Sequence, residues 1–550
     1  MTITLFHNAR IFTASVDPDN SWAEAMVVES GTVTFTGTST AAREAAGAEA
    51  EANDLDGRLV LPGFIDSHTH LLMTGEALGK VELTSASTLA EIQARLAEAR
   101  AADPGAARIL GRGWLFDSVP GGQPTAAMLD EVLGDVPVYL DNNDLHSCWV
   151  NSAALAELGI TADTPDPIGG RIVRDASGQA TGLLLETAAQ QLVWPFLAAQ
   201  SSDADRDLAL ERAFQAYLAA GVTGAVDMAF DEIGLATIER ALERHSGVLP
   251  LRIAAHWFIA NTGDDQANAA QVQRAAQLAS KDYGPSFRLV GVKFIADGVI
   301  DACTAALHEP YSNGSDAGPI WPLERLAPAL AAADAAGLQV AVHAIGDAAS
   351  AIALDAIEQA MEANGPIERR HRIEHLEYAA PGTAERMARL GVTASMQPVH
   401  TDAALRPNWD AMLGDDRTER GFAWTEYEQA GALLAFSTDA PTAPHAALPN
   451  MFVATTRRSA LDNTFEPVQP QLALPLANAI SHATRDSAAS VGDGATHGRL
   501  EAGYAADFAV LDADPFTEGN DVLLTAQVVR TVMAGQTVYA AEPARTMSGA

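Results

Sequence analysis

The 550-residue sequence is poor in cysteine, in lysine and in long apolar runs. Its two cysteines, Cys148 and Cys303, argue against a disulfide framework and fit a reducing compartment, although these two could still pair. No apolar run reaches the roughly 18 residues of a membrane span, so we expect none. The N-terminal segment MTITLFHNARIFTA lacks the basic region and cleavage site of a signal peptide. We therefore expect a cytoplasmic protein.

Basic charge is also scarce. The chain carries 34 lysines and arginines against 71 aspartates and glutamates, a formal net charge of −37. This balance disfavours nucleic acids and anionic membranes as partners and leaves a small molecule as the expected one. The acidic residues are dispersed, as on a solubilising surface. Only three of the basic residues are lysines, namely Lys80, Lys281 and Lys293.

The middle of the chain alternates apolar strand-like runs with helical stretches rich in Ala, Leu, Glu and Arg. Near-continuous apolar strands between helices indicate a parallel sheet with both faces covered. Eight such units predict a (β/α)8 barrel within an α/β fold. The runs lie at 59–68, 221–230, 251–259, 287–297, 337–347, 369–377, 391–398 and 432–441.

The segments outside these runs differ in style. Residues 1–57 and 497–550 consist of short strand-like pieces with Gly and Asn-Pro-Asp-type turn signals, and we expect them to pair into one composite β-sandwich. The barrel is then assigned to 58–80 and 201–496. Residues 81–200 separate the first run from the second, and a connection that long must fold. We expect an inserted α/β subdomain there, which could act as a lid.

Groups able to bind a metal end five of the eight runs, and barrel enzymes place their catalytic groups at the carboxyl ends of strands. His68 and His70, two residues apart, would project from one face of a strand. The full set is His68, His70, Lys293, Asp297, His343, His375 and Asp439. Each has an ordinary alternative, such as a core histidine, a surface histidine or a turn cap. Together on one rim, they favour a metal site.

Lys293 lies inside the apolar run LVGVKFIA, where a buried ammonium is costly without a partner. An ion pair with Asp297 or another acid is the ordinary interpretation. A neutral lysine amine can also react with CO2 to give a carbamate, a carboxylate able to bridge two cations, whereas arginine stays protonated. Four histidines, this carboxylate and one aspartate would hold two divalent metals such as Zn2+.

A set of motifs in fixed order resembles the amidohydrolase superfamily, in particular its YtcJ-like branch, which includes N-substituted formamide deformylases. These motifs are LPGFIDSHTH, VKFIADGVID, VAVHAIGDAA, RIEHLEY, MQPVHTD and FSTDAP, with GRGW, PTAAMLD, LHSCWVNSAALAELGI and GLLLE in the insertion. The resemblance implies that His68, His70 and Asp439 bind the more buried metal. It implies that carboxylated Lys293 bridges to a second metal held by His343 and His375. A homodimer is a further family expectation.

The resemblance and the residues together predict a metal-dependent hydrolase of a small N-substituted amide or formamide. A metal-bound hydroxide would attack the carbonyl, with Asp439 as proton shuttle. A mononuclear deaminase, or another cyclic amide or ester hydrolase on the same scaffold, is the alternative. A non-catalytic metal-binding protein is a third.

Aromatic and polar residues in the insertion and after the barrel strands are candidates for substrate binding. An aromatic lining favours an apolar or aromatic substrate group. Packing within a core is the alternative for the aromatic residues, and a surface position for the histidines. The candidates are Trp114, His146, Trp149, Asp297, Tyr311, Trp321 and His400.

Overall fold

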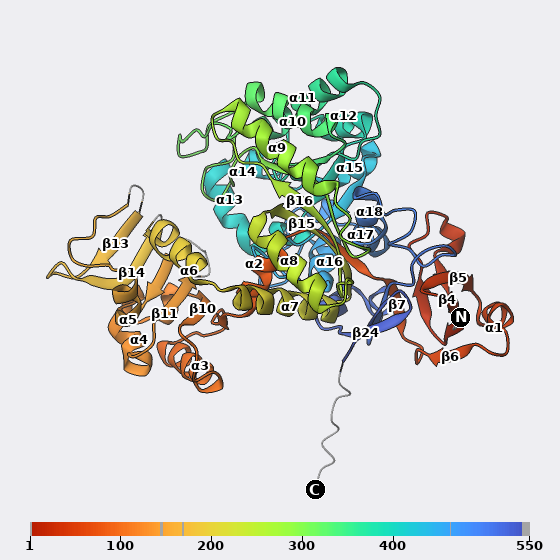
Figure 1. Cartoon of the computed structure of the whole chain (residues 1–550), viewed down its shortest axis with the longest axis horizontal. Coiled ribbons are helices and arrows are strands. Elements are labelled where there is room, and N and C mark those ends of the chain that lie inside the picture. The colour runs from red at the N-terminus through yellow and green to blue at the C-terminus, as the bar shows by residue number, and fades with distance from the viewer. Residues whose placement is uncertain (1–2, 143–146, 168–169, 187, 463, 542–550) are drawn as a thin grey trace, which may run out of the picture. The chain divides into compact units, whose positions relative to one another are not determined.

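The computed structural model divides the chain into two compact units (Figure 1). One comprises Met1–Leu71 with Phe214–Ala550, and the other comprises Leu72–Ala213, whereas the sequence placed an insertion at 81–200. The structure describes residues 3–142, 147–167, 170–186, 188–462 and 464–541.

The first unit contains an eight-stranded sheet in which every paired neighbour is parallel, and it confirms the predicted barrel. Each of the eight predicted runs holds one strand of this sheet, and these strands follow one another in chain order. They are β8 (Phe64–Thr69), β15 (Val222–Phe230), β16 (Arg252–Phe258), β17 (Phe287–Ile295), β18 (Gln339–Ala344), β19 (Arg372–His375), β20 (Thr393–Met396) and β21 (Leu434–Phe436). The first run, 59–68, also holds a strand of another sheet, Leu59–Pro62.

The first and last strands meet just beyond their carboxyl ends. The backbone N–H of Asp439 donates to the carbonyl of His68 at 2.8 Å, and that of His70 donates to the carbonyl of Ala440 at 3.0 Å. The Asp66 carboxylate also accepts the backbone N–H of Thr438 at 2.9 Å. This closure brings the residues after β21 beside those at the end of β8.

Helices connect the barrel strands because each has one apolar face and clear end signals. In α8 (Glu232–Arg244), the Asp231 side chain caps the first turn, and Leu235, Ile238 and Ala241 form the buried face. The later connecting helices are α9 (Asp265–Ala279), α10 (Leu323–Ala335), α11 (Asp347–Asn364), α12 (Thr383–Leu390) and α15 (Trp424–Ala430), followed by α16 (Ala447–Thr456), α17 (Leu476–His482) and α18 (Arg485–Ser490).

Two further sheets of the first unit are built from the chain's terminal regions. One has the order β5 (Thr32–Gly37), β4 (Ala25–Glu29), β1 (Ile3–His7) and β6 (Glu51–Asp54). The other has the order β24 (Gln536–Ala540), β23 (Val528–Met533), β22 (Phe508–Leu511), β7 (Leu59–Pro62), β2 (Arg10–Phe12) and β3 (Trp22–Ala23), and so joins strands from both ends. Phe6 and Met26 of the first sheet share a core with Phe508 and Val532 of the second.

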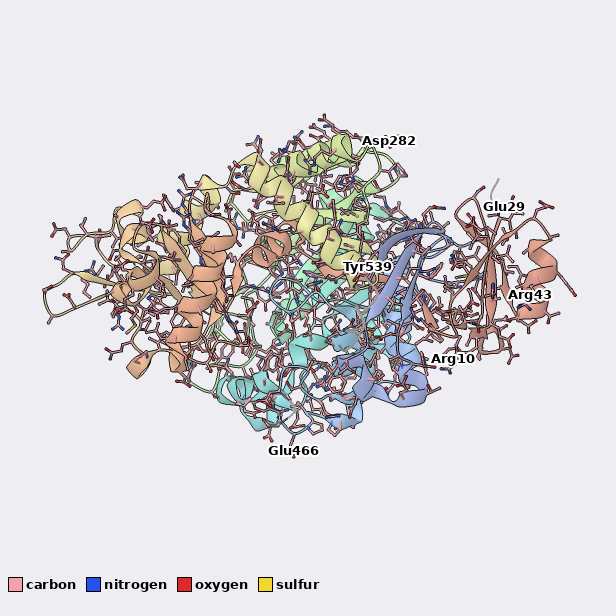
Figure 2. The ribbon with its side chains drawn as sticks, turned by 90° about the horizontal axis from the view of Figure 1, so that it is seen from below. Arg10, Glu29, Arg43, Asp282, Glu466 and Tyr539 are labelled. Carbon is pink, nitrogen blue, oxygen red and sulfur yellow. The ribbon has the colours of Figure 1, made fainter. Side chains whose placement is uncertain are left out.

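Charged side chains cover the outside of the first unit, as its composition requires. Figure 2 labels Arg43 on α1 (Ser39–Ala46), Asp282 in the loop before β17 and Glu466 in the loop after α16, and all three are exposed.

The second unit has its own six-stranded sheet and its own core. The strand order is β13 (Gly170–Arg174), β14 (Ala180–Glu186), β12 (Ser147–Val150), β11 (Val138–Asn142), β10 (Ile109–Trp114) and β9 (Val81–Glu82). The helices include α3 (Leu89–Ala102), α4 (Ala126–Leu133), α5 (Ser152–Glu157) and α6 (Trp194–Gln200). A capping box between Thr88 and Glu91 starts α3.

The structure bears on the cysteines and on membrane-spanning helices. Cys148 is buried in the second unit, Cys303 is half-buried in the first, and both are free thiols. Within the part of the chain that the structure describes, none of the helices has the length and apolarity needed to cross a membrane.

Candidate metal centre

His68, His70 and Asp439 converge where the barrel closes. The Nε2 atoms of His68 and His70 lie 3.3 and 3.1 Å from the same oxygen, Oδ1 of Asp439. One ligand atom from each of the three residues lies within 4.8 Å of the other two. His68 and Asp439 are buried and His70 is half-buried. The pairing of β8 with the segment after β21 therefore assembles three metal-competent groups at one point.

The other ring nitrogen of each histidine is occupied by an acceptor. His68 Nδ1 lies 2.7 Å from Oε2 of Glu374, and His70 Nδ1 lies 2.8 Å from the carbonyl oxygen of Met228. A carboxylate and a carbonyl can only accept, so in the neutral rings each Nδ1 carries the proton and each Nε2 presents a lone pair. This is the tautomer that a metal-ligating histidine adopts.

The arrangement fits a divalent cation. Oδ1 of Asp439 is a buried oxygen without a hydrogen-bond partner in the described chain, and it faces two nitrogen lone pairs. Two imidazoles and one ionised carboxylate are a donor set that suits Zn2+.

Lys293 extends from β17 toward the same group. Its Nζ lies 3.3 Å from Nε2 of His68, and the side chain is 2% exposed. Burial lowers the pKa of the Lys293 ammonium to about 8, although Glu374 and Asp439 oppose the change. The predicted alternative partner, Asp297, is engaged elsewhere: its carboxylate accepts the backbone N–H groups of three residues. These are Ala306, Ile345 and Gly346, at 3.0, 3.0 and 2.8 Å.

His343 and His375 lie next to each other at the ends of β18 and β19, with ring centroids 4.3 Å apart. His375 Nδ1 lies 3.0 Å from Oε1 of Gln397, and His343 Nε2 lies 3.3 Å from the carbonyl oxygen of Gly298. Burial lowers the pKa of His343 to about 3 and that of His375 well below its usual value. Both are therefore neutral imidazoles, and the ring of His375 also lies 4.8 Å from that of His68.

A second group of ligand-type atoms consists of His375, Glu377 and His400. His400, in the short helix Pro398–Thr401, stacks parallel to His375 at 6.1 Å. Its Nδ1 lies 3.0 Å from Oε1 of Glu377, and its Nε2 lies 3.7 Å from Oδ2 of Asp439. Burial lowers the pKa of His400, but the contact with Glu377 more than offsets this, and the net change is upward. His400 thus faces the oxygen of Asp439 that the other two histidines leave free.

The sequence analysis missed three charged residues behind these groups, Arg372, Glu374 and Glu377. Arg372 and Glu374 are fully buried, and Arg372 Nε donates to Oε1 of Glu374 at 2.5 Å while its Nη2 donates to the carbonyl of Ser67 at 2.6 Å. In the motif RIEHLEY, only His375 was predicted as a ligand, with a surface position as its alternative. The motif's only usable signal was that Glu374 and Glu377 lie within two residues of His375.

The aromatic candidates for substrate binding are packed into cores. Trp114 and Trp149 are fully buried in the second unit, and their indole N–H groups donate to the carbonyls of Leu140 and Thr125. In the first unit, the Tyr311 hydroxyl donates to the carbonyl of Ala305, and Trp321 packs edge-on against Phe294. These contacts give each of the four a packing role. His146 lies outside the described residues.

Known proteins match over nearly the whole chain. The sequence profile of the family described as "Amidohydrolase family" matches residues 51–539. YtcJ of Bacillus subtilis (strain 168), a protein named as an amidohydrolase, is 32% identical over 97% of this chain and 99% of its own. The N-substituted formamide deformylase of Arthrobacter pascens is 29% identical over 97% of each chain. The crystal structure of an uncharacterized metal-dependent hydrolase from Pyrococcus furiosus has a TM-score of 0.75 and 27% identity, and the match covers 94% of this chain and 100% of that one.

Proposed function

The chain belongs to the amidohydrolase family, and we propose that it is a metal-dependent hydrolase that cleaves the carbon–nitrogen bond of a small N-substituted amide or formamide. The observation that carries this proposal is the convergence of His68 and His70 Nε2 on the partnerless Oδ1 of Asp439. The relatives support the reaction class, since one is named a formamide deformylase and another a metal-dependent hydrolase.

His68, His70 and Asp439 would hold one divalent metal ion, which we take to be Zn2+. When bound, such an ion polarises a carbonyl oxygen and lowers the pKa of water. Lys293, as a carbamate, would hold a second ion together with His343 and His375. Burial of Nζ favours the neutral amine that this modification needs. The amine nitrogen bonds to the carbon of CO2, and one proton is released.

The two carboxylate oxygens of Asp439 have different neighbours. Oδ1 faces the two histidines, whereas Oδ2 accepts the Thr442 hydroxyl at 3.1 Å and lies 3.7 Å from Nε2 of His400. As a carboxylate, Asp439 can take a proton at Oδ2 from the attacking water. Asp439 then delivers this proton to the leaving nitrogen, because an amine must be protonated before it can leave.

The test is a mass-spectrometric product screen of the protein reconstituted with Zn2+ and bicarbonate. The substrates are formamides, anilides, lactams, lactones, carbamates and aminated heterocycles. We expect an acid and an amine as products, and a loss of more than about 100-fold in kcat/KM for Asp439→Asn. Asp462→Asn, a change at an exposed aspartate, is the control. Near-normal turnover in Asp439→Asn would refute the role of this carboxylate.

The lysine is tested by a matched pair. Lys293→Ala should lower both the metal content and the amide hydrolysis, whereas Lys281→Ala, at an exposed lysine, should change neither. A one-dalton gain on an aminated heterocycle, with no amide cleaved, would identify a deaminase instead and contradict the proposed role of Lys293.

A further inference from the structure

Asp66 is a buried carboxyl group beside the candidate metal centre that the proposed mechanism does not use. It lies on β8, two residues before His68, and is 5% exposed. Its Oδ1 accepts the backbone N–H of Thr438 at 2.9 Å, and its Oδ2 accepts the hydroxyl of Thr438 at 2.5 Å. We call these two hydrogen bonds the Asp66–Thr438 bridge. Both oxygens therefore bind the residue that directly precedes Asp439.

The backbone on both sides of Asp439 is fixed by this bridge and by β8. The N–H of Thr438 donates to Asp66, and the N–H of Asp439 donates to the carbonyl of His68 at 2.8 Å. The N–H of Ala440 donates to Oγ1 of Thr438 at 3.2 Å. The Thr438 hydroxyl thus donates to Asp66 before Asp439 and accepts from Ala440 after it.

Two more buried hydroxyl groups contact the same segment. The Tyr217 hydroxyl donates to Oδ2 of Asp66 at 3.4 Å and lies 2.5 Å from Oγ1 of Thr69. The Thr69 hydroxyl lies 3.3 Å from the carbonyl oxygen of Ala440, and Thr69 and Tyr217 are both fully buried. The bridge is therefore part of a network that water does not reach.

Asp439 itself has a backbone conformation that must be held in place. Its φ is +57°, in the left-handed region, which residues with a Cβ atom adopt at a cost in free energy. Aspartate tolerates this region better than most residues, but such a conformation persists only where the surroundings determine it. The hydrogen bonds of Thr438 and Ala440, one on each side, supply that determination.

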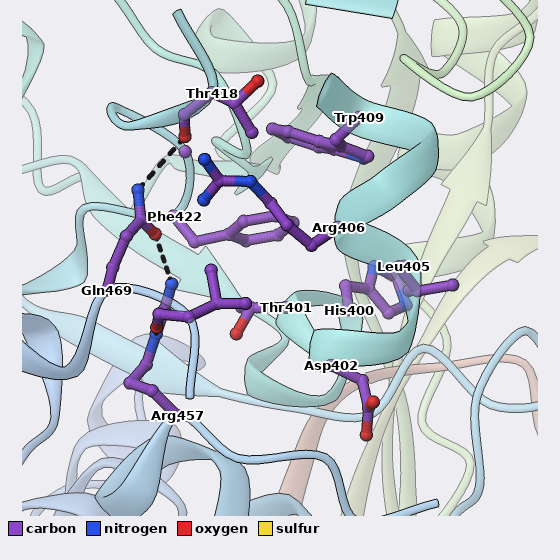
Figure 3. Close-up of a pocket in the computed structure, with 12 residues that line it drawn as sticks. His400, Thr401, Asp402, Leu405, Arg406, Trp409, Thr418, Phe422, Arg457 and Gln469 are labelled. Carbon is purple, nitrogen blue, oxygen red and sulfur yellow. Dashed lines mark hydrogen bonds between the residues drawn. The ribbon is translucent and has the colours of Figure 1, made fainter. Parts of the chain in front are cut away.

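The side-chain contacts of Asp439 do not by themselves set the direction of Oδ1. Oδ1 has no hydrogen-bond partner among the described residues. The hydroxyl of Thr442, at 3.1 Å, and Nε2 of His400, at 3.7 Å, both lie against Oδ2. His400, labelled in Figure 3, belongs to the short helix Pro398–Thr401 and not to β8. The direction in which Oδ1 points thus depends on the backbone.

We propose that Asp66 is a positioning residue for the metal site: through the Asp66–Thr438 bridge it holds the backbone of Asp439 so that Oδ1 faces His68 and His70. Asp66 is not itself a ligand, because both of its oxygens are bound to Thr438. This inference rests on the proposed function, since it takes Oδ1 of Asp439 to be a metal ligand. It adds a residue outside the ligand set on which metal affinity depends.

The first test measures Zn2+ affinity by competition with a chromophoric chelator on the full-length protein. Thr438→Val keeps the size of the side chain but leaves Oδ2 of Asp66 and the N–H of Ala440 each short of a partner. We expect about 10- to 100-fold weaker Zn2+ binding, as for other residues that orient metal ligands. Thr438→Ser keeps the hydroxyl and should stay within about threefold of the wild type.

The matched control is Thr237→Val, which removes another buried hydroxyl. Thr237 lies on α8, and its hydroxyl donates to the carbonyl of Ile233 at 2.8 Å. The change should leave Zn2+ affinity within about threefold of the wild type. Weakening by Thr237→Val as large as that by Thr438→Val would mean that metal affinity follows general stability, and it would overturn the proposal.

The second test separates positioning from stability by the visible absorption of the Co2+-substituted protein, which reports ligand geometry. The Co2+ spectrum should shift in Thr438→Val and return in Thr438→Ser. If Thr438→Val only lowers the urea midpoint, with the wild-type spectrum and Zn2+ affinity, Asp66 stabilises the fold alone and the proposal is wrong. If Thr438→Val does not fold, Asp66→Asn replaces one acceptor oxygen by a donor, and it should shift the spectrum in the same way.

Asp439→Asn distinguishes a failure of this inference from a failure of the proposed function. If Asp439→Asn binds Zn2+ and Co2+ as the wild type does, Asp439 is not a ligand, and the proposed function fails together with this inference. If Asp439→Asn loses metal affinity whereas Thr438→Val and Asp66→Asn keep both affinity and spectrum, the ligand set stands and only the role of Asp66 is refuted.

Discussion

Glu374→Gln is the substitution that best tests how the barrel interior positions the metal ligands. Glu374 is fully buried; its Oε1 accepts from Arg372 at 2.5 Å, and its Oε2 lies 2.7 Å from Nδ1 of His68. Glutamine has the same size but only one acceptor oxygen. Its NH2 group would therefore face either the guanidinium or the imidazole N–H, donor against donor.

Glu374→Gln should lower both the free energy of unfolding and the affinity for Zn2+. Arg372 would stay buried without its charge partner, which costs about 3–5 kcal/mol of unfolding free energy. His68 would lose the contact that fixes its tautomer, which lowers Zn2+ affinity about 10- to 100-fold. Although burial raises the pKa of Glu374, Arg372 and His68 hold it well below its usual value. The stabilisation is therefore present above about pH 4.3 and is lost as the pH falls through the folded pKa.

The assay is a urea titration of the metal-free protein at pH 7, together with Zn2+ competition against a chromophoric chelator. The control is Glu368→Gln, which removes an exposed glutamate paired with Arg370 and should cost less than about 1 kcal/mol. If Glu374→Gln matches the wild type both in its urea midpoint and in its Zn2+ affinity, the reasoning on this buried network is wrong.

Two other predictions concern buried side chains elsewhere in the chain. Burial, together with the nearby charge of Arg372, lowers the pKa of His256 to about 3. Below about pH 6.5, His256 therefore takes up a proton in the unfolded chain but stays neutral in the folded protein. Between pH 7 and pH 5, the free energy of unfolding of the wild type, measured by urea titration, should fall by about 2 kcal/mol more than that of His256→Gln. His308→Gln, a change at an exposed histidine, is the control. Parallel pH profiles for the wild type and His256→Gln would contradict this prediction. Trp114→Ala should destabilise the unit Leu72–Ala213 by about 3–5 kcal/mol, measured by the rate of proteolysis within that unit in urea, and a loss below about 1 kcal/mol would contradict its placement in the core.

The barrel could be predicted because its strands carry a local signal. A parallel strand covered on both faces is apolar at nearly every position, so each of the eight runs stands out from the helices around it. The boundary of the second unit was harder to place. It is set by which side chains pack together between Leu72 and Ala213, and no local residue pattern marks that division.

The candidate ligands could be predicted for a related reason. Strand ends meet at one rim of a barrel, so position placed His68, His70 and Asp439 among the rim residues, and the family resemblance implied that these three share one metal. Arg372, Glu374 and Glu377 were not predicted, because a charged motif ordinarily lies at the surface. Their burial depends on partners far away in the chain, such as the Ser67 carbonyl and the Ser395 hydroxyl, both bound by Arg372.

The sequence by itself determined the order of strands and helices, the family and the residues that end each barrel strand, because these depend on local patterning and on short motifs. Only the tertiary structure decided which polar atoms are left without partners. Oδ1 of Asp439, for example, is buried by segments distant in sequence, and none of the described residues supplies it with a hydrogen-bond partner. Burial and hydrogen bonding are properties of the packed chain, and they are what distinguish a ligand site from a list of candidate residues.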